Sequence, residues 1–174
     1  SNTPNSTGYL GWYAKQLANN NLIGIVLAQS PEFVAPYNAY QPIFGTNPIA
    51  VSVPDSGDSN PVTLDMATSA YALFGLLEAK TAGKSIPDNV AYDSEGQPTT
   101  DPSEALAGAI RVFDRSHKSS GLALMVELLA GGLSGSAIED KRASACWGNF
   151  VVAIEPKIIW GDEAGLDTFR ERVN

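Results

Sequence analysis

The sequence predicts a mixed α/β (α+β) fold in which helices flank a mixed sheet. Two observations support this: a nearly continuous aliphatic run, "LIGIVLAQS" (22–30), predicts a strand buried on both faces, and strand-like and helix-like segments alternate along the chain. Its 174 residues, 44% hydrophobic and 17% charged, fit a single domain spanning residues 1–174. No internal repeat is visible.

The N-terminal third predicts a helix, a strand and a loop. Leu10, Tyr13 and Leu17 recur at helical spacing within residues 8–20. The aliphatic strand follows. Residues 30–48 then contain four prolines in nineteen residues, which predicts an irregular loop because each proline removes a backbone donor.

Two further strands, 49–53 and 62–64, are separated by the turn-rich "PDSGDSN", so we expect them to pair antiparallel. A helical pattern begins in "DMATSAYALFGLLEAKTAGK", and Gly83 is placed to cap its C-terminus. The sequence therefore predicts that the strand ending at Leu64 runs directly into a helix.

The second half begins with a turn-rich connector over residues 85–106. Within it Asp93–Gly96 lacks the ligand spacing of a calcium loop, which favours solvated turn chemistry. A helix is expected over 121–133, a strand over 147–156 and a surface helix over 162–173. The apolar face of the 121–133 helix, interpreted as core, consists of Leu122, Met125, Val126, Leu129 and Leu133.

The formal charge of −8 repels nucleic acid and anionic lipid, and no Lys/Arg cluster offsets it, so neither partner is expected. No apolar run approaches a membrane span, and the N-terminus lacks a signal-peptide pattern, which predicts a soluble, cytoplasmic protein. A single cysteine, Cys146, excludes an internal disulfide and a cysteine metal cluster. We expect no metal site.

Several common motifs are excluded by spacing. The glycines of "AGGLSGSA" (130–137) have no following Lys-Ser/Thr, so this is not a P-loop, and G-x-G-x-x-G is absent. Gly132 and Gly135 are also wrongly spaced for a nucleophile elbow. The sequence therefore does not support an orthodox Rossmann fold, a nucleotide triphosphatase or that type of hydrolase.

Two candidate sites remain. In the turn at residues 64–69, small side chains would let an anion or a ribose approach free amide groups at a helix start. Alternatively, Asp65 or Thr68 simply caps that helix. The second candidate is the pair His117 and Lys118, which is either an ordinary surface pair or functional.

The order of four motifs resembles the malate/L-lactate/L-sulfolactate dehydrogenase family, which is unrelated in fold to Rossmann-type lactate dehydrogenases. The resemblance extends from about Gly8 to the C-terminus. It is carried by "GTNP" (45–48), "DMATS" (65–69), "PTTDP" (98–102) and "GLALMVELLAG" (121–131).

The resemblance implies an L-sulfolactate dehydrogenase-like cofactor-binding domain that forms a homodimer. It implies NAD- or NADP-dependent oxidation of a 2-hydroxy acid, or reduction of a 2-keto acid or cyclic imine. It also favours a ligand role over capping for Asp65. The candidate cofactor contacts are Ser30, Asp65, Met66, Ala67, Thr68, His117 and Lys118.

The sequence also departs from the family pattern. The family's N-terminal Ser-His-Gly segment, whose histidine moves a proton, has no counterpart before Ser1, and His117 is the only histidine. A second family histidine position falls on Ser6, and serine cannot shuttle a proton near neutral pH. A Gly-Lys pair is replaced by Phe74 and Gly75. Glycines around the His-Lys pair are replaced by Arg115, Ser116, Ser119 and Ser120.

Two hypotheses follow. The chain is either a truncated or partial dehydrogenase, inactive alone because no catalytic residue of the family is retained, or a non-catalytic pseudoenzyme or assembly protein that keeps the fold. The substrate and the choice between NAD and NADP stay open.

Overall fold

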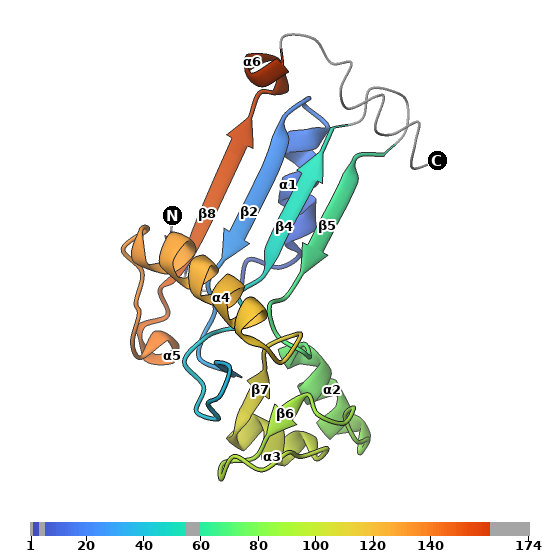
Figure 1. The fold of residues 1–174 in the computed structure, drawn as a ribbon, viewed down its shortest axis with the longest axis vertical. Coiled ribbons are helices and arrows are strands. Elements are labelled where there is room, and N and C mark those ends of the chain that lie inside the picture. Colours follow the sequence, from blue (N-terminus) through green and yellow to red (C-terminus); the bar gives the residue numbers. More distant parts are fainter. Residues whose placement is uncertain (1, 4–5, 55–59, 161–174) are drawn as a thin grey trace.

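The computed structural model describes residues 2–3, 6–54 and 60–160 (Figure 1). The surface helix predicted over 162–173 lies outside the described residues. Within them, no helix is both long and apolar enough to cross a membrane.

The main sheet has five strands in the order β1-β8-β2-β4-β5, and every neighbouring pair is antiparallel. The four predicted strand regions and the antiparallel pairing of the second and third are confirmed. The strands are β1 Asn2–Thr3, β2 Ile23–Ala28, β4 Ile49–Val53, β5 Val62–Met66 and β8 Trp147–Ile154.

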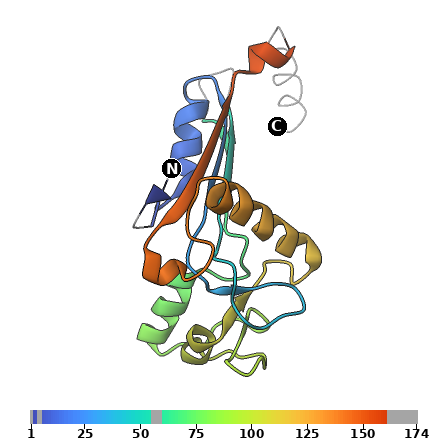
Figure 2. The same ribbon diagram turned by 90° about the vertical axis from the view of Figure 1, so that its left-hand side faces the viewer.

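Helix α1, Leu10–Ala18, covers one face of this sheet, where Leu10 and Ala14 pack on Val26, Ala28 and Ala50. This confirms the predicted N-terminal helix. Helix α4, His117–Val126, lies on the opposite face (Figure 2). Successive side chains of a strand point to opposite faces of the sheet, so each helix packs on its own set of strand residues.

The α4 helix continues as a π-helix, η1, over Glu127–Gly132. Helix α4 starts four residues before the predicted start at 121, since Ser116 provides the N-cap. The predicted apolar face is only partly right: Val126 is buried, but Met125 is 49% and Leu133 69% exposed. Two features explain the difference. Alanines make the close contacts of this helix, and the wider π-turns change which residues face the sheet. The residues that α4 and η1 bury are Ser119, Ala123, Val126, Glu127, Ala130 and Gly131.

A smaller lower region has its own core and a mixed sheet, β3-β7-β6. It lies below the main sheet in Figure 1. Strands of two residues carry no periodicity, which is why the predicted loops 30–48 and 85–106 conceal β3 and β6. The elements are β3 Val34–Ala35, α2 Leu73–Ala82, β6 Ala91–Tyr92, α3 Pro102–Ala107 and β7 Ala109–Arg111.

The predicted direct passage from strand to helix after Leu64 is wrong. Strand β5 continues to Met66 because residues 62–66 all pair with β4, and α2 begins only at Leu73. Residues 67–72 are a connecting segment, so no helix start lies at Asp65–Ser69. The predicted cap at Gly83 is confirmed by its left-handed φ of 63°.

Two short helices complete the fold, α5 at Lys141–Ser144 and α6 at Pro156–Trp160. The fold class is confirmed. The single-domain organisation over residues 1–174 stays a prediction.

Glycine at position 148 is required where β8 meets η1. A Cβ there would overlap the carbonyl oxygen of Ala130. We therefore expect Gly148→Ala to lower the free energy of unfolding by about 2–3 kcal/mol, measured by urea denaturation. The control is Gly132→Ala, because a Cβ at Gly132 meets nothing within 4 Å. Equal stabilities of the two variants would contradict the close packing.

Candidate functional site

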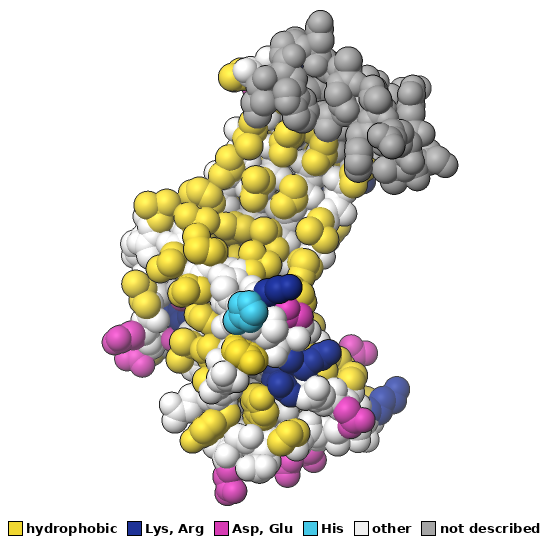
Figure 3. Space-filling model, viewed as in Figure 1, with side chains coloured by type: hydrophobic (Ala, Val, Ile, Leu, Met, Phe, Trp, Pro, Cys, Tyr) yellow, Lys and Arg dark blue, Asp and Glu magenta, His cyan; other side chains and the backbone are white. Residues whose placement is uncertain are grey.

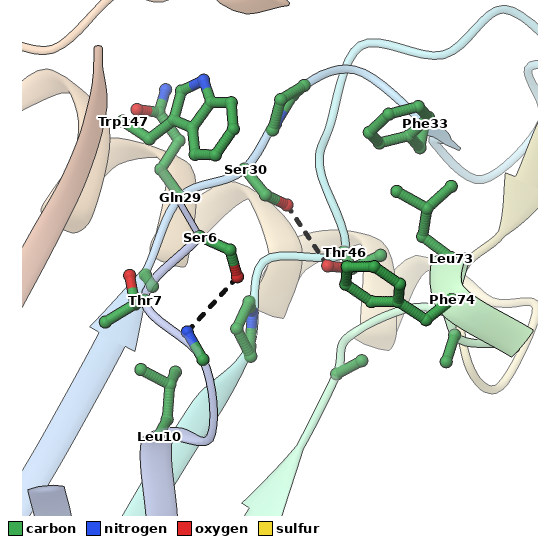
Figure 4. A pocket seen from close by; sticks show the side chains of 16 residues that line it. Ser6, Thr7, Leu10, Gln29, Ser30, Phe33, Thr46, Leu73, Phe74 and Trp147 are labelled. Carbon is green, nitrogen blue, oxygen red and sulfur yellow. Dashed lines mark hydrogen bonds between the residues drawn. The ribbon is translucent and has the colours of Figure 1, made fainter. Parts of the chain in front are cut away.

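A cavity of about 460 Å³ opens where the end of β2, the start of α1 and the segment leading into α2 converge (Figure 4). Chain segments distant in sequence contribute to it. Its lining consists of Ser6, Thr7, Gly8, Leu10, Ala28, Gln29, Ser30, Pro31, Phe33, Thr46, Pro48, Ala67, Ala72, Leu73, Phe74 and Trp147.

Hydroxyl groups form one part of this lining. Ser30 Oγ and Thr46 Oγ1 are 3.2 Å apart and share a hydrogen bond, and the Ser30 N–H donates to Asn47 Oδ1 at 3.2 Å. Gly45 makes this approach possible, because a Cβ there would overlap Ser30. Asn47 has a left-handed φ of 36°, a conformation that asparagine tolerates well. The "GTNP" motif therefore builds the polar edge of the cavity.

Rings and aliphatic side chains form another part of the lining, where Phe33, Leu73 and Phe74 lie near one another in Figure 4. Of the 16 residues drawn around the cavity, none carries a charge. The cavity therefore suits a largely apolar group that also offers polar atoms to the hydroxyl side.

Behind the cavity, the carboxylate of Glu127 accepts three hydrogen bonds from buried donors. Lys141 Nζ lies 2.8 Å from Oε1, Gln29 Nε2 lies 2.7 Å from Oε1, and Asn47 Nδ2 lies 2.7 Å from Oε2. The side chain of Lys141 is 0% exposed and that of Glu127 is 9% exposed. Such a buried ion pair needs these extra donors to offset the loss of water.

The Glu127 cluster, meaning Glu127, Lys141, Gln29 and Asn47, holds the cavity wall in place. Gln29 itself lines the cavity, and Asn47 accepts the Ser30 amide. The carbonyl of Lys141 accepts the indole N–H of Trp147 at 2.9 Å. Sequence reasoning found no role for Glu127, and the only available signal was a carboxylate within an apolar helix.

Two candidate cofactor contacts, Ser30 and Ala67, meet at the cavity, together with two departures from the family pattern, Ser6 and Phe74. Ser6 Oγ accepts the Gly8 N–H at 3.3 Å. The predicted family histidine position therefore does face this cavity, although a serine occupies it.

The neighbouring predicted residues have structural partners. Asp65 Oδ2 accepts the Gly11 N–H at 2.6 Å, so its carboxylate caps the first turn of α1 and not the helix that follows it in sequence. Thr68 is fully buried, and its hydroxyl donates to the carbonyls of Thr46 and Asn47. Met66 ends β5 and is half-buried.

His117 and Lys118 are the first two residues of α4, and this helix lies on the opposite side of the sheet from α1 (Figure 2). His117 borders a separate open groove and lies 6.3 Å, ring to ring, from Tyr37. The structure therefore does not bring the His-Lys pair to the cavity that contains Ser30 and Ala67.

The α4 N-terminus is already occupied by a carboxylate. Asp114 accepts hydrogen bonds from the Ser116 hydroxyl at 2.6 Å, from the Ser116 N–H at 2.8 Å and from the Ser119 hydroxyl. These bonds, those of the Ser116 and Ser119 hydroxyls above all, hold the pKa of Asp114 well below its usual range. A negative charge here also complements the helix dipole. No group of three or more His, Cys, Asp or Glu in the described residues is placed to hold a metal ion.

A family model described as malate/L-lactate dehydrogenase matches residues 1–174. The chain belongs to this family. The sequence resemblance is thereby confirmed, and members of the family use nicotinamide cofactors.

Individual relatives carry different substrate names. L-sulfolactate dehydrogenase of Methanothermobacter thermautotrophicus is 42% identical over 97% of this chain and 52% of its own length. Delta(1)-pyrroline-2-carboxylate reductase 1 of Burkholderia ambifaria is 44% identical over 86% of this chain and 46% of its own length. The crystal structure of a dehydrogenase from Sinorhizobium meliloti has a TM-score of 0.88 and 35% identity, with coverage of 97% of this chain and 51% of that one. The chain thus spans about half the length of the relatives it matches.

Removing the cation of the Glu127 cluster should be costly. Lys141→Met leaves the Glu127 carboxylate buried without its charged partner, so we expect a loss of about 3–5 kcal/mol in the free energy of unfolding. Adding Glu127→Gln should recover part of that loss, measured by urea denaturation. The matched control is Lys118→Met at an exposed position, expected to change stability by less than about 0.5 kcal/mol. A similar small effect at Lys141 would contradict the role of the ion pair.

Acid should weaken the hydrogen bonds that Asp114 accepts from Ser116 and Ser119. Because the folded pKa lies below the ordinary value of 3.8, the charged carboxylate stabilises the fold above about pH 4, and this contribution is lost as the pH falls further. Thermal denaturation of Asp114→Asn should therefore show a lower Tm than the wild type at neutral pH and a flatter decline between about pH 4 and pH 2. Asp88→Asn, at an exposed carboxylate, is the control. Parallel curves of Tm against pH for the wild type and Asp114→Asn would refute this stabilising role of Asp114.

Proposed function

We propose that this chain is the cofactor-contacting half of an NAD- or NADP-dependent oxidoreductase that acts on a small 2-hydroxy acid, 2-keto acid or cyclic imine. The nicotinamide end of the cofactor would occupy the cavity. The observation that carries this proposal is the meeting of Ser30 and Ala67, two of the candidate cofactor contacts, in one cavity. Family membership supplies the reaction class.

The cavity fits a nicotinamide group. Its volume of about 460 Å³ falls within the roughly 300–1,000 Å³ of small-molecule sites. The hydroxyls of Ser30 and Thr46 are placed to bond a carboxamide or carboxylate, and the apolar wall would exclude water from the ring. When bound, the nicotinamide supplies or accepts the hydride.

The other candidate contacts have more indirect roles in this proposal. Asp65 would act by fixing the start of α1, whose Leu10 lines the cavity. Thr68 would hold the loop that carries Thr46. His117 and Lys118 lie on the far side of the sheet, which fits a homodimer in which a second copy presents them to the cofactor. A cytoplasmic location is also part of the proposal.

A second candidate is a non-catalytic binding protein. The observation that favours it is Ser6, which lines the cavity at the position where the resemblance implies a histidine. A serine cannot exchange a proton near neutral pH as imidazole does. Cofactor binding without turnover would be the signature of this alternative.

Titration of the purified chain with NADH and with NADPH tests the proposal. We expect saturable heat in calorimetry for one of the two. Ala67→Trp should abolish binding because the indole fills the cavity, while circular dichroism stays unchanged. The control is Ala82→Trp at the exposed end of α2.

No binding at millimolar cofactor would overturn the proposal, and unchanged binding by Ala67→Trp would place the cofactor elsewhere. Turnover of a 2-keto acid or cyclic imine with the reduced cofactor would then exclude the non-catalytic alternative.

A further inference from the structure

We propose that Phe74 determines substrate specificity. Its ring makes the cavity prefer an acid with an uncharged, apolar substituent, such as a cyclic imine carboxylate, over an acid with a second anionic group. This inference rests on the proposed function, because it concerns the same cavity.

The exposure of Phe74 is the first observation. Its side chain lines the cavity, yet the residue is 72% exposed and belongs to none of the buried core clusters. A single exposed apolar residue is ordinary on a protein surface. Here, however, the ring stands beside Leu73 and Phe33 at a concave site, where a ligand would bury it (Figure 4).

The second observation is that Phe74 projects from a fixed support. Helix α2 is anchored in the lower core by Leu76 and Ala79, both buried. Gly75 leaves room for the ring of Tyr71, which would lie 2.9 Å from a Cβ at that position. The ring of Phe74 is therefore presented by a packed helix and not by a long loop.

The third observation is the lack of charge in the lining: none of the 16 residues around the cavity carries one. A second carboxylate or sulfonate would find no cationic side chain in this lining, and beside Phe74 the side chains of Phe33 and Leu73 offer it no donor. A charged group that loses water without gaining a partner is strongly disfavoured, whereas an aliphatic ring gains by the same contact.

Sequence similarity alone does not make this choice. The named relatives include an L-sulfolactate dehydrogenase and a Delta(1)-pyrroline-2-carboxylate reductase at comparable identity, 42% and 44%. The first name denotes an acid with a second anionic group, and the second denotes a ring. Phe74 and its apolar neighbours Phe33 and Leu73 favour the cyclic imine as the substrate of this chain.

The experiment measures binding, so that it does not depend on turnover. The chain is saturated with the oxidised form of the cofactor that binds, and tryptophan fluorescence follows the addition of Delta(1)-piperideine-2-carboxylate or of sulfopyruvate. Trp147 lines the cavity and provides the signal. We expect the cyclic imine to bind at least about tenfold more tightly.

Variants then assign the preference to Phe74. Phe74→Ala should reduce it to about threefold or less, Phe74→Lys should reverse it in favour of sulfopyruvate, and Phe74→Leu should retain most of it. Because the side chain is mostly exposed, these variants are expected to fold. Leu124→Lys, at an exposed position outside the cavity, is the control and should leave the preference unchanged.

The outcomes separate the two proposals. If the cofactor binds but the acids show no preference, do not bind, or keep their preference in Phe74→Lys, the specificity role is wrong and the proposed cofactor site stands. If no cofactor binds, the proposed function fails and this inference fails with it.

Discussion

The buried carboxylate of Glu127 is the interaction on which the site depends. Three donors from three separate segments converge on it: Gln29 at the end of β2, Asn47 in the loop before β4, and Lys141 in α5. None of these polar groups could be buried alone without a large desolvation cost. Because these groups satisfy one another's hydrogen bonds, they can be buried together where a hydrophobic contact would otherwise stand. They also tie the segments that carry Ser30, Thr46 and Trp147 to one point.

The π-helix belongs to the same arrangement. It begins at Glu127, where α4 would otherwise continue with a regular repeat, and it brings Ala130 and Gly131 against the sheet and Gln29. Gly148 must lack a side chain because the Ala130 carbonyl approaches it so closely. The π-helix, the ion pair and the glycine thus all belong to one close contact between a helix and the main sheet.

The same construction separates the two groups of candidate site residues. Ser30 and Ala67 open toward the α1 side of the sheet, whereas His117 and Lys118 start α4 on the other side. That side faces the viewer in Figure 3, where hydrophobic side chains gather on the surface. Because Asp114 already supplies the negative charge at the α4 N-terminus, that helix end is not a free anion site in this chain. The cavity is therefore the centre of the proposed chemistry.

The sequence by itself determined the strands β2, β4, β5 and β8, the helix α1, the Gly83 cap and the family, because long aliphatic runs and ordered motifs are local signals. It did not determine the two-residue strands, the true start of α2 or the partner of Asp65, since pairing with a neighbouring strand overrides local pattern. It also gave no role to Glu127 or Phe74. Tertiary structure decided those, because the burial of a charge and the exposure of a ring depend on which distant segments surround them.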